Sequence, residues 1–344
     1  MRQKQIKGLN LEELTSLCNE QGFSSFRAKQ IYHWMYRHRV MDIALMNNIP
    51  DNVKKFIEDN YTLKTLEIER IQDSNVENTK KILFKTADGM FIESVSMIDK
   101  TLHTVCISSQ VGCNVDCKFC ATGIMGFKRN LSCGEIIDQI IEITHMREEP
   151  ITNIVYMGMG EPFLNYNEVI KSAEILHSPH GMNLGRNRIT ISTSGIVSKI
   201  KKYIDEKQPY KLAVSLNATD DTSREKIIPI NKKWNIEMII NELTRYPSDK
   251  KNMVMLEYVL LKGINDSMED AQKLSAYGNK LHCKINVIPF NDIGNEYSRP
   301  DEETINQFIS VLHKNQKYYQ TLVRWSKGID IDAACGQLST QEIE

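Results

Sequence analysis

Three cysteines, Cys113, Cys117 and Cys120, lie within eight residues in the stretch GCNVDCKFCATG. Thiolates are soft ligands, and clustered thiolates bind zinc or iron–sulfur clusters. A structural zinc usually takes four protein ligands in two separated pairs, but no second CxxC pair occurs in this sequence. Three cysteines on a 4Fe–4S cluster would leave one iron open. An open iron can bind a substrate or a cofactor, so the spacing favours a catalytic cluster.

The composition is that of a globular protein in a reducing compartment. Of the 344 residues, 41% are apolar, which is enough for a large core, and the net charge is −1. The opening MRQKQIKGLN lacks the apolar stretch of a signal peptide, and no run of about 18 apolar residues could cross a bilayer. We therefore expect a cytoplasmic protein without a membrane segment. Eight cysteines in that compartment are more often thiols, metal ligands or redox groups than structural disulfides.

The hydrophobic pattern changes twice along the chain and predicts three domains. Residues 1–62 are expected to be helical, with Asn10 and Glu13 as a capping box and Pro50 opening a further helix. Residues 63–103 alternate apolar and polar side chains in three runs, with the turn Asp88-Gly89 between the last two. That pattern predicts a small antiparallel β extension. Residues 104–344 form the third predicted domain.

The third domain alternates short apolar runs with helical stretches. The runs lie at residues 105–108, 153–157, 188–192, 211–216, 253–261, 284–289 and 321–325. Repeated strand–helix units predict a parallel sheet, and about six of them predict an α/β fold, a partial (β/α)6 barrel that resembles an incomplete TIM barrel. In such folds the chemistry sits at the carboxyl ends of the strands. The three-cysteine loop follows the first strand and should therefore lie at that face.

The spacing C-x3-C-x2-C, with Phe119 before the last cysteine, resembles that of the radical S-adenosylmethionine (SAM) enzymes. The resemblance implies that Cys113, Cys117 and Cys120 hold one 4Fe–4S cluster. It also implies that the amino and carboxylate groups of SAM chelate the open iron. An electron from the cluster would then split the sulfonium and yield a 5′-deoxyadenosyl radical. The cofactors expected are therefore the cluster and SAM.

Polar and small residues at the ends of the later strands are candidates for SAM binding. MGMGEP ends the second strand, where Gly160 lets backbone approach the methionine part of SAM and Glu161 offers a carboxylate to its ammonium group. Further candidates at strand ends are Ser192, Ser215, Leu216, Asn217 and Asn291. Each alone would be an ordinary loop residue, but together they are expected to line one face.

The whole set of motifs closely resembles the dual-specificity ribosomal and transfer RNA adenine methyltransferases of the RlmN/Cfr type. The motifs are TVCISSQVGCNVDCKFCATG, GFKRNL, MGMGEP, STSG, PINKK and DIDAACGQL, and the similarity extends from about residue 5 to residue 338. The resemblance implies that Cys335 takes a methyl group from one SAM, and that a second SAM supplies the radical that activates it. The resulting methylene radical adds to adenine. Cys106 then attacks the sulfur of Cys335, forming a transient disulfide as the adduct breaks, and Glu93 matches the proton acceptor.

Several readings stay open at this point. Pro162 and the long helical N-terminus favour methylation of adenine carbon 2, whereas Ile329 is slightly more like the carbon-8 resistance enzymes. Asn217 stands where many relatives carry histidine. Two other classes are a non-catalytic, zinc-stabilised RNA-binding protein and a thiol-redox protein using Cys106 and Cys335. The first leaves Cys106, Cys335 and MGMGEP without a role, and the second does not require the three clustered cysteines.

The resemblance also implies partners. These are 23S rRNA and tRNA as substrates and an external one-electron reductant of the flavodoxin or ferredoxin kind, with no membrane. The protein itself is expected to be a monomer. The N-terminal domain is a candidate RNA-docking module because aromatic and basic side chains gather there, although the aromatic ones could equally form its core. They are Phe26, Tyr32, His33, Trp34, Tyr36 and Arg37.

Overall fold

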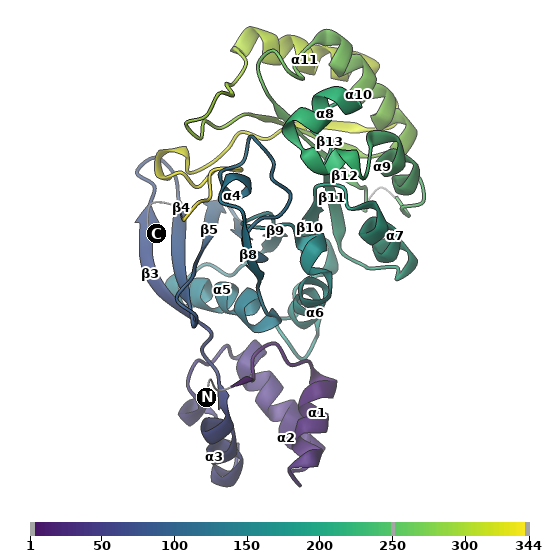
Figure 1. Cartoon of the computed structure of the whole chain (residues 1–344). Coiled ribbons are helices and arrows are strands. Elements are labelled where there is room, and N and C mark those ends of the chain that lie inside the picture. Colours follow the sequence, from purple (N-terminus) through teal and green to yellow (C-terminus); the bar gives the residue numbers. More distant parts are fainter. Residues whose placement is uncertain (1–3, 249–251, 341–344) are drawn as a thin grey trace.

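The computed structural model describes residues 4–248 and 252–340. Its main feature is a ten-stranded sheet in the order β14-β13-β12-β11-β10-β9-β6-β5-β4-β3 (Figure 1). The strands from β6 to β14 pair in parallel, and those from β5 to β3 pair antiparallel. Along the described chain, each crossover between parallel strands carries at least one helix. The predicted α/β partial barrel with a β extension is therefore confirmed.

The parallel strands are β6 (Leu102–Cys106), β9 (Asn153–Tyr156), β10 (Ile189–Thr193), β11 (Lys211–Ser215), β12 (Met255–Leu260), β13 (Lys284–Pro289) and β14 (Gln320–Val323). The covering helices are α5 (Cys133–Met146), α6 (Tyr166–His177), α7 (Val197–Asp205), α8 (Asp221–Ile227), α9 (Ile236–Leu243), α10 (Met268–Leu281) and α11 (Glu302–Asn315). A capping box of Ser132 and Glu135 starts α5. One face of the sheet packs its apolar residues against these helices, which leaves the other face free to carry polar side chains.

The β extension continues the barrel sheet. It consists of β3 (Leu66–Asp73), β4 (Thr79–Thr86) and β5 (Phe91–Asp99). The antiparallel pairing of β5 with β6 places Val95 opposite Cys106 and Met97 opposite Thr104. Since side chains on a strand alternate between faces, Glu93, Val95 and Met97 share the face of the sheet that carries Cys106.

The loop of the three cysteines has local structure that the sequence pattern did not predict. A small hairpin of β7 (Gln110–Gly112) and β8 (Phe127–Asn130) frames it, and the short helix α4 (Ala121–Ile124) begins directly after Cys120. Gly123 packs against the loop so closely that a Cβ there would lie 2.6 Å from the carbonyl oxygen of Cys117. Only glycine therefore fits this position without a shift of the backbone.

The N-terminal segment is helical as predicted (Figure 1). It contains α1 (Leu11–Glu20), α2 (Ser25–Tyr32), the π-helix η1 (His33–Arg37), the 3-10 helix η2 (Ile43–Leu45) and α3 (Asp51–Asn60), with the short strands β1 (Lys4–Gln5) and β2 (Tyr61–Thr62) paired in parallel. The capping box of Asn10 and Glu13 is present. Two glycines allow the backbone of the N-terminal segment to contact α5. A Cβ on Gly134 would lie 2.5 Å from the carbonyl oxygen of Lys7, and a Cβ on Gly8 would lie 2.5 Å from the amide nitrogen of Gly134.

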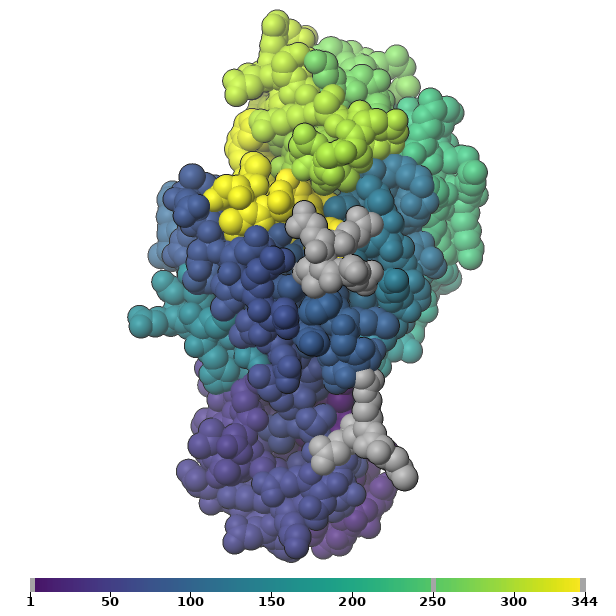
Figure 2. Space-filling view, turned by 60° about the vertical axis from the view of Figure 1, so that its left-hand side comes forward, coloured from purple at the N-terminus to yellow at the C-terminus, as the bar shows by residue number. Residues whose placement is uncertain are grey.

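The C-terminal segment, residues 328–340, returns to the β extension and to the cysteine loop. It begins with the 3-10 helix η6 (Ile329–Ile331). Figures 1 and 2 show it in yellow beside the blue strands of the extension. Asp330 accepts hydrogen bonds from the Ser74 hydroxyl at 2.8 Å and from the Asn75 amide at 2.9 Å. Contacts between residues some 255 positions apart thus fix this segment against the sheet.

No helix within residues 4–248 and 252–340 has the length and apolar character needed to span a membrane.

Candidate active site

Two cavities open at the carboxyl ends of the parallel strands and share part of their walls. The cluster cavity, about 160 Å³, is lined by Cys113, Cys117 and Cys120 together with residues from the later strands. The carrier cavity, about 270 Å³, is lined by Cys106 and by residues of β5, β6 and the segment after β14. The residues common to both walls are Cys120, Thr122, Met157, Gly158, Arg324, Cys335 and Gly336. Cys335 is therefore accessible from both cavities.

The three clustered cysteines face one cavity as free thiols. Burial raises the pKa of Cys113 to about 12, and burial also raises the pKa values of Cys117 and Cys120. A metal that binds these sulfurs must displace their protons, so binding is coupled to deprotonation. Arg224 is the cation that lowers the pKa of Cys117.

The donor set fits a cluster. The three thiols line the wall of the cluster cavity. A 4Fe–4S cluster takes one thiolate on each of several irons, so it suits ligands that surround a space. These residues can therefore hold the predicted cluster with three sulfurs.

The turn after β9 forms one wall of the cluster cavity. Gly160 adopts φ +98°, and a Cβ there would lie 2.5 Å from the Cβ of Gln110. Glu161 is 4% exposed, and its carboxylate accepts hydrogen bonds from the Phe163 amide at 2.9 Å and the Ser194 amide at 2.7 Å. Burial raises the pKa of Glu161, and these two amides oppose that shift. A carboxylate held so firmly has spare lone pairs that face the cavity and could accept from an ammonium group.

Some of the predicted strand-end residues line the cluster cavity, and others do not. Ser192, Ser215 and Asn217 line the cluster cavity together with Gly160 and Glu161. The predicted SAM contact Leu216 is fully buried and is not among the lining residues. Leu216 directly follows Ser215, and neighbouring residues on a strand point to opposite faces.

Asn291 is also absent from the lining of both cavities. Its side-chain amide donates to the carbonyl oxygen of Cys335 at 3.0 Å. Asn291 therefore anchors the C-terminal segment. Asn217 adopts φ +56° and accepts a hydrogen bond from the Val259 amide at 2.8 Å, which fixes its side chain at the cavity wall.

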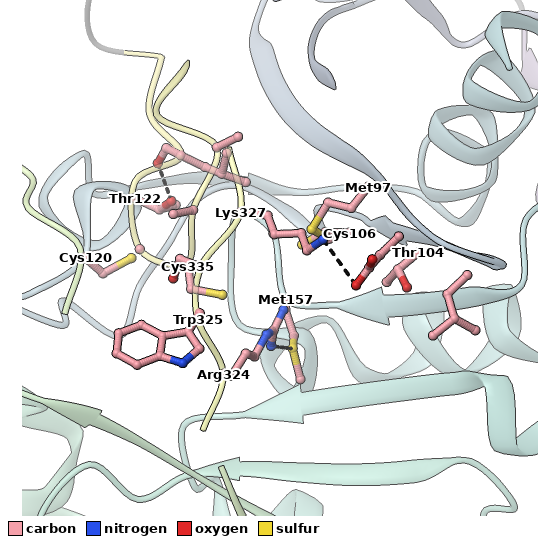
Figure 3. A pocket seen from close by; sticks show the side chains of 18 residues that line it. Met97, Thr104, Cys106, Cys120, Thr122, Met157, Arg324, Trp325, Lys327 and Cys335 are labelled. Atoms are coloured by element: carbon pink, nitrogen blue, oxygen red, sulfur yellow. Dashed lines mark hydrogen bonds and ion pairs between the residues drawn. The ribbon is translucent and has the colours of Figure 1, made fainter. Parts of the chain in front are cut away.

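Cys106 and Cys335 lie on the wall of the same cavity although 229 positions separate them in the chain (Figure 3). The segment that carries Cys335 is tied to the cysteine loop, because Ala121 donates to the carbonyl of Gly336 at 2.8 Å and the Thr122 hydroxyl donates to the carbonyl of Leu338 at 2.6 Å. Burial raises the pKa of Cys106 to about 12. Cys106 is buried and Cys335 is partly exposed, and both are free cysteines.

Arg324 is a site residue that the motifs did not identify. It follows β14, lines both cavities, and its guanidinium lies 3.5 Å from the sulfur of Met157 (Figure 3). The pKa of Arg324 is raised, first by Cys335 and then by Glu257 and Cys106, while burial opposes the shift. The same charge lowers the pKa of Cys106. Arg324 thus favours the thiolate of Cys106 and partly offsets the effect of burial.

Glu93 is buried, with 1% of its surface exposed, although a carboxylate on a strand is usually solvated. Its carboxylate pairs with Lys81 at 3.3 Å and accepts from the Ser339 amide at 2.9 Å. Burial raises the pKa of Glu93, and Lys81 is the largest opposing influence. Glu93 does not line either cavity and lies behind the C-terminal segment at Ser339.

Comparison with known proteins decides the family. Residues 107–274 match the radical SAM superfamily, and residues 4–62 match the ribosomal RNA large subunit methyltransferase N-terminal domain. A probable dual-specificity RNA methyltransferase RlmN of Aquifex aeolicus is 41% identical, with 98% of each chain covered. The dual-specificity RNA methyltransferase RlmN of Nautilia profundicola is also 41% identical, over 92% of this chain and 93% of the relative. The chain belongs to the RlmN family.

A solved structure agrees with this assignment. The crystal structure of a radical SAM methyltransferase from Sphaerobacter thermophilus has a TM-score of 0.92, is 40% identical, and covers 97% of this chain and 99% of its own. The predicted enzyme class, a radical SAM RNA methyltransferase, is confirmed, and so are the expected cofactors, a 4Fe–4S cluster and SAM. The readings as a non-catalytic zinc protein or as a thiol-redox protein are not retained.

The candidate docking residues of this RlmN-family chain divide into a buried and an exposed group, with Trp34 half-buried between them. Tyr32 and Tyr36 belong to the core, and the Tyr36 hydroxyl accepts from the Gly8 amide at 2.8 Å. Phe26 is 58% exposed, and His33 and Arg37 are exposed as well. The exposed group could contact RNA, whereas the buried group shapes the module.

Proposed function

We propose that this protein methylates carbon 2 of a specific adenine in 23S rRNA and in tRNA, by way of a methyl group carried on Cys335. The observation that supports the proposal most directly is the position of Cys335 between the two cavities. From there its sulfur can face the cofactors on one side and an RNA base on the other. The many relatives named RlmN support carbon 2 over carbon 8.

Cys113, Cys117 and Cys120 would hold the cluster, and Gly160, Glu161, Ser192, Ser215 and Asn217 would surround SAM. When bound, the cluster and SAM supply a carbon-centred radical that removes a hydrogen atom from a methyl group on Cys335. Ring carbons of adenine are poor nucleophiles, so a carbon radical on the carrier avoids the obstacle to direct displacement.

The chain's own residues carry the remaining steps. The thiolate of Cys335 takes the methyl group by displacement, and Arg324 lines the walls of both cavities beside it. After the carrier carbon has joined the adenine ring, the Cys106 thiolate attacks the sulfur of Cys335. Before this attack the adduct radical gives up one electron, which the oxidised cluster would accept. The carbon–sulfur bond then breaks with its electron pair on carbon, that carbon takes up a proton and becomes the methyl group, and a disulfide between Cys106 and Cys335 forms. Glu93 takes the proton of the ring carbon, which requires the segment around Ser339 to move aside.

Mass spectrometry of RNA digests tests the proposal. Unmodified 23S rRNA fragments and tRNA transcripts would be incubated with reconstituted, reduced protein and SAM. We expect 2-methyladenosine together with 5′-deoxyadenosine. The appearance of 8-methyladenosine would reassign the ring position, and the absence of any methylated adenosine in both RNAs would overturn the function.

The N-terminal residues 1–62 are proposed as an RNA-docking domain, followed by a β extension over residues 63–103 and the catalytic barrel over residues 104–344. Exposed Phe26 with Arg27 at 5.8 Å from its ring supports the docking role. We also propose that the enzyme works in the cytoplasm as a monomer and receives single electrons from a flavodoxin-like or ferredoxin-like protein.

Glu93→Gln is expected to lower methylation by about 100- to 10,000-fold while 5′-deoxyadenosine still forms, because only the general base is removed. In the unmodified protein the carboxylate must be ionised to act. Since burial raises its pKa, the acid limb of the pH–rate profile should lie above the value of about 4.3 for a free glutamate. Single-turnover rates between pH 5 and pH 9 measure this limb.

Lys81→Met is the matched variant for Glu93. Lys81 lowers the pKa of Glu93, so its loss should shift the acid limb to higher pH and leave the rate at alkaline pH close to that of the unmodified protein. A profile that Lys81→Met leaves unchanged would contradict the role of Glu93 as base.

A further inference from the structure

An exposed tryptophan stands at the edge of the carrier cavity. Trp325 follows Arg324 directly after β14, lines the cavity together with Cys106 and Cys335, and is 54% exposed (Figure 3). Trp325 thus presents a large aromatic ring, half in solvent, beside the cavity that holds Cys335. None of the roles derived above uses this side chain.

One face of the Trp325 ring is occupied by a cation. The Arg299 guanidinium lies 5.0 Å from the ring centroid, and Arg299 is itself exposed on the loop between β13 and α11. A cation–π contact of this kind is worth about 0.5–1 kcal/mol at an exposed site. It favours one orientation of the ring. A flat ring with one side held and the rest open to solvent is a suitable platform for stacking.

The charges around the cavity mouth suit a polyanion. Arg324 and Lys327 line the cavity, and Arg299 adds a third basic group beside the ring. Asp99 is the lining carboxylate, and Lys327 approaches it at 3.2 Å while staying one-third exposed. An RNA strand places phosphates next to any base that it presents, and basic side chains at such a site provide much of the affinity.

We propose that Trp325 stacks on the nucleobase next to the target adenine in the RNA substrate, at the mouth of the carrier cavity. The target base itself must reach Cys335, and Cys106 at the same wall is only 7% exposed. Trp325 lies at the solvent-facing rim of the cavity. When the target adenine leaves the base stack, the adjacent nucleobase loses its stacking partner, and Trp325 is placed to replace it. This inference rests on the proposed function, because it assumes that the carrier cavity receives an RNA base.

Binding of unmodified tRNA transcripts to the reconstituted full-length protein tests the proposal. We expect Trp325→Ala to raise the dissociation constant about tenfold, the size typical of one lost base stack. Trp325→Phe should stay within about threefold of the unmodified protein, because it keeps an aromatic face. Tyr318→Ala is the matched control, since Tyr318 is 60% exposed, stacks on His282 and lines neither cavity.

An abasic nucleotide distinguishes the neighbour from the target. The abasic nucleotide is introduced in turn at the position of the target adenine and at each of the two adjacent positions, in the RNA that the enzyme methylates. The penalty of Trp325→Ala should vanish for one flanking position and persist for the other substitutions. Equal affinities of Trp325→Ala and the unmodified protein would overturn the stacking role, and so would a penalty that vanishes only at the target. A stacking penalty without methylated adenosine in any RNA would instead overturn the proposed function.

Discussion

Cys335→Ala is expected to abolish adenine methylation completely and to leave no covalent adduct between protein and RNA. Without the sulfur there is no nucleophile to take the first methyl group and no carrier for the carbon that joins the ring. The substitution removes one sulfur atom from a segment held by other contacts. Those contacts run to the backbone of Cys335, Gly336 and Leu338 and do not involve the thiol. Loss of activity should therefore occur without loss of the fold.

Denaturing gels and mass spectrometry of the RNA measure the result. Cys18→Ala is the matched control, because Cys18 is a buried thiol of the N-terminal helices and lines neither cavity. It should methylate RNA at the rate of the unmodified protein. A covalent adduct formed by Cys335→Ala would show that another residue carries the methyl group.

Cys106→Ala should give the opposite phenotype. The carrier carbon can still join the adenine ring, but no thiolate is present to attack the sulfur of Cys335 and release the product. The protein should therefore accumulate as a stable adduct with RNA. Burial raises the pKa of Cys106 to about 12, and Arg324 opposes this shift only in part, so the thiol must give up its proton as the adduct is resolved. Free methylated RNA from Cys106→Ala at the normal rate would contradict the disulfide step.

The cluster loop and most strand-end residues could be predicted because local rules place them. A C-x3-C-x2-C loop after the first strand of a parallel sheet must lie at the carboxyl edge, and Ser192 and Ser215 reach the cavity there. Leu216 stays a prediction, but its side chain is buried and does not line the cavity, because strand ends do not state which side chain points inward. One residue of register reverses the face.

Arg324 and Glu257 could not be predicted in the same way. Glu257 is 5% exposed and stands in the apolar run MLEYVLL, and it accepts from Asn286 on the neighbouring strand at 2.7 Å. The strand that carries Asn286 and the cavity that Glu257 lines are brought next to Glu257 only by folding, because β12 and β13 pair only in the folded sheet. The burial of Glu93 has a similar cause, because the Ser339 amide that covers it comes from 246 residues further along the chain.

Lys7→Met is expected to lower the free energy of unfolding by about 3–5 kcal/mol, the range for breaking a buried ion pair. Lys7 pairs with Asp138 of α5, and neither side chain has any exposed surface. The other carboxylate oxygen of Asp138 accepts from the Thr65 amide at 2.6 Å and from the Thr65 hydroxyl at 2.5 Å. Without the ammonium, Asp138 keeps a buried charge with only the dipoles of Thr65 to stabilise it.

Lys171→Met is the control for this effect. Lys171 on α6 pairs with Glu13 on α1, so it joins the same two parts of the chain, but both side chains are partly exposed, at 22% and 42%. Such a pair contributes about 0–1 kcal/mol. Urea unfolding of both variants measures the free energy of unfolding that each substitution removes. Equal losses would show that the buried pair stabilises the fold no more than the exposed pair does.

The Lys7 pair also has a consequence for RNA binding. Asp138 lies on α5 of the barrel and pairs with Lys7, which follows β1. It also accepts from Thr65, which precedes β3. One carboxylate therefore connects the N-terminal helices, the β extension and the barrel. If the N-terminal helices dock RNA, their orientation relative to the carrier cavity decides whether the target adenine reaches Cys335. Lys7→Met should therefore reduce methylation more than it weakens RNA binding, because the docking surface stays intact while its position is lost. Affinity and single-turnover rate measured on the same RNA, at a temperature where the variant remains folded, would separate the two; a loss confined to affinity would contradict this coupling.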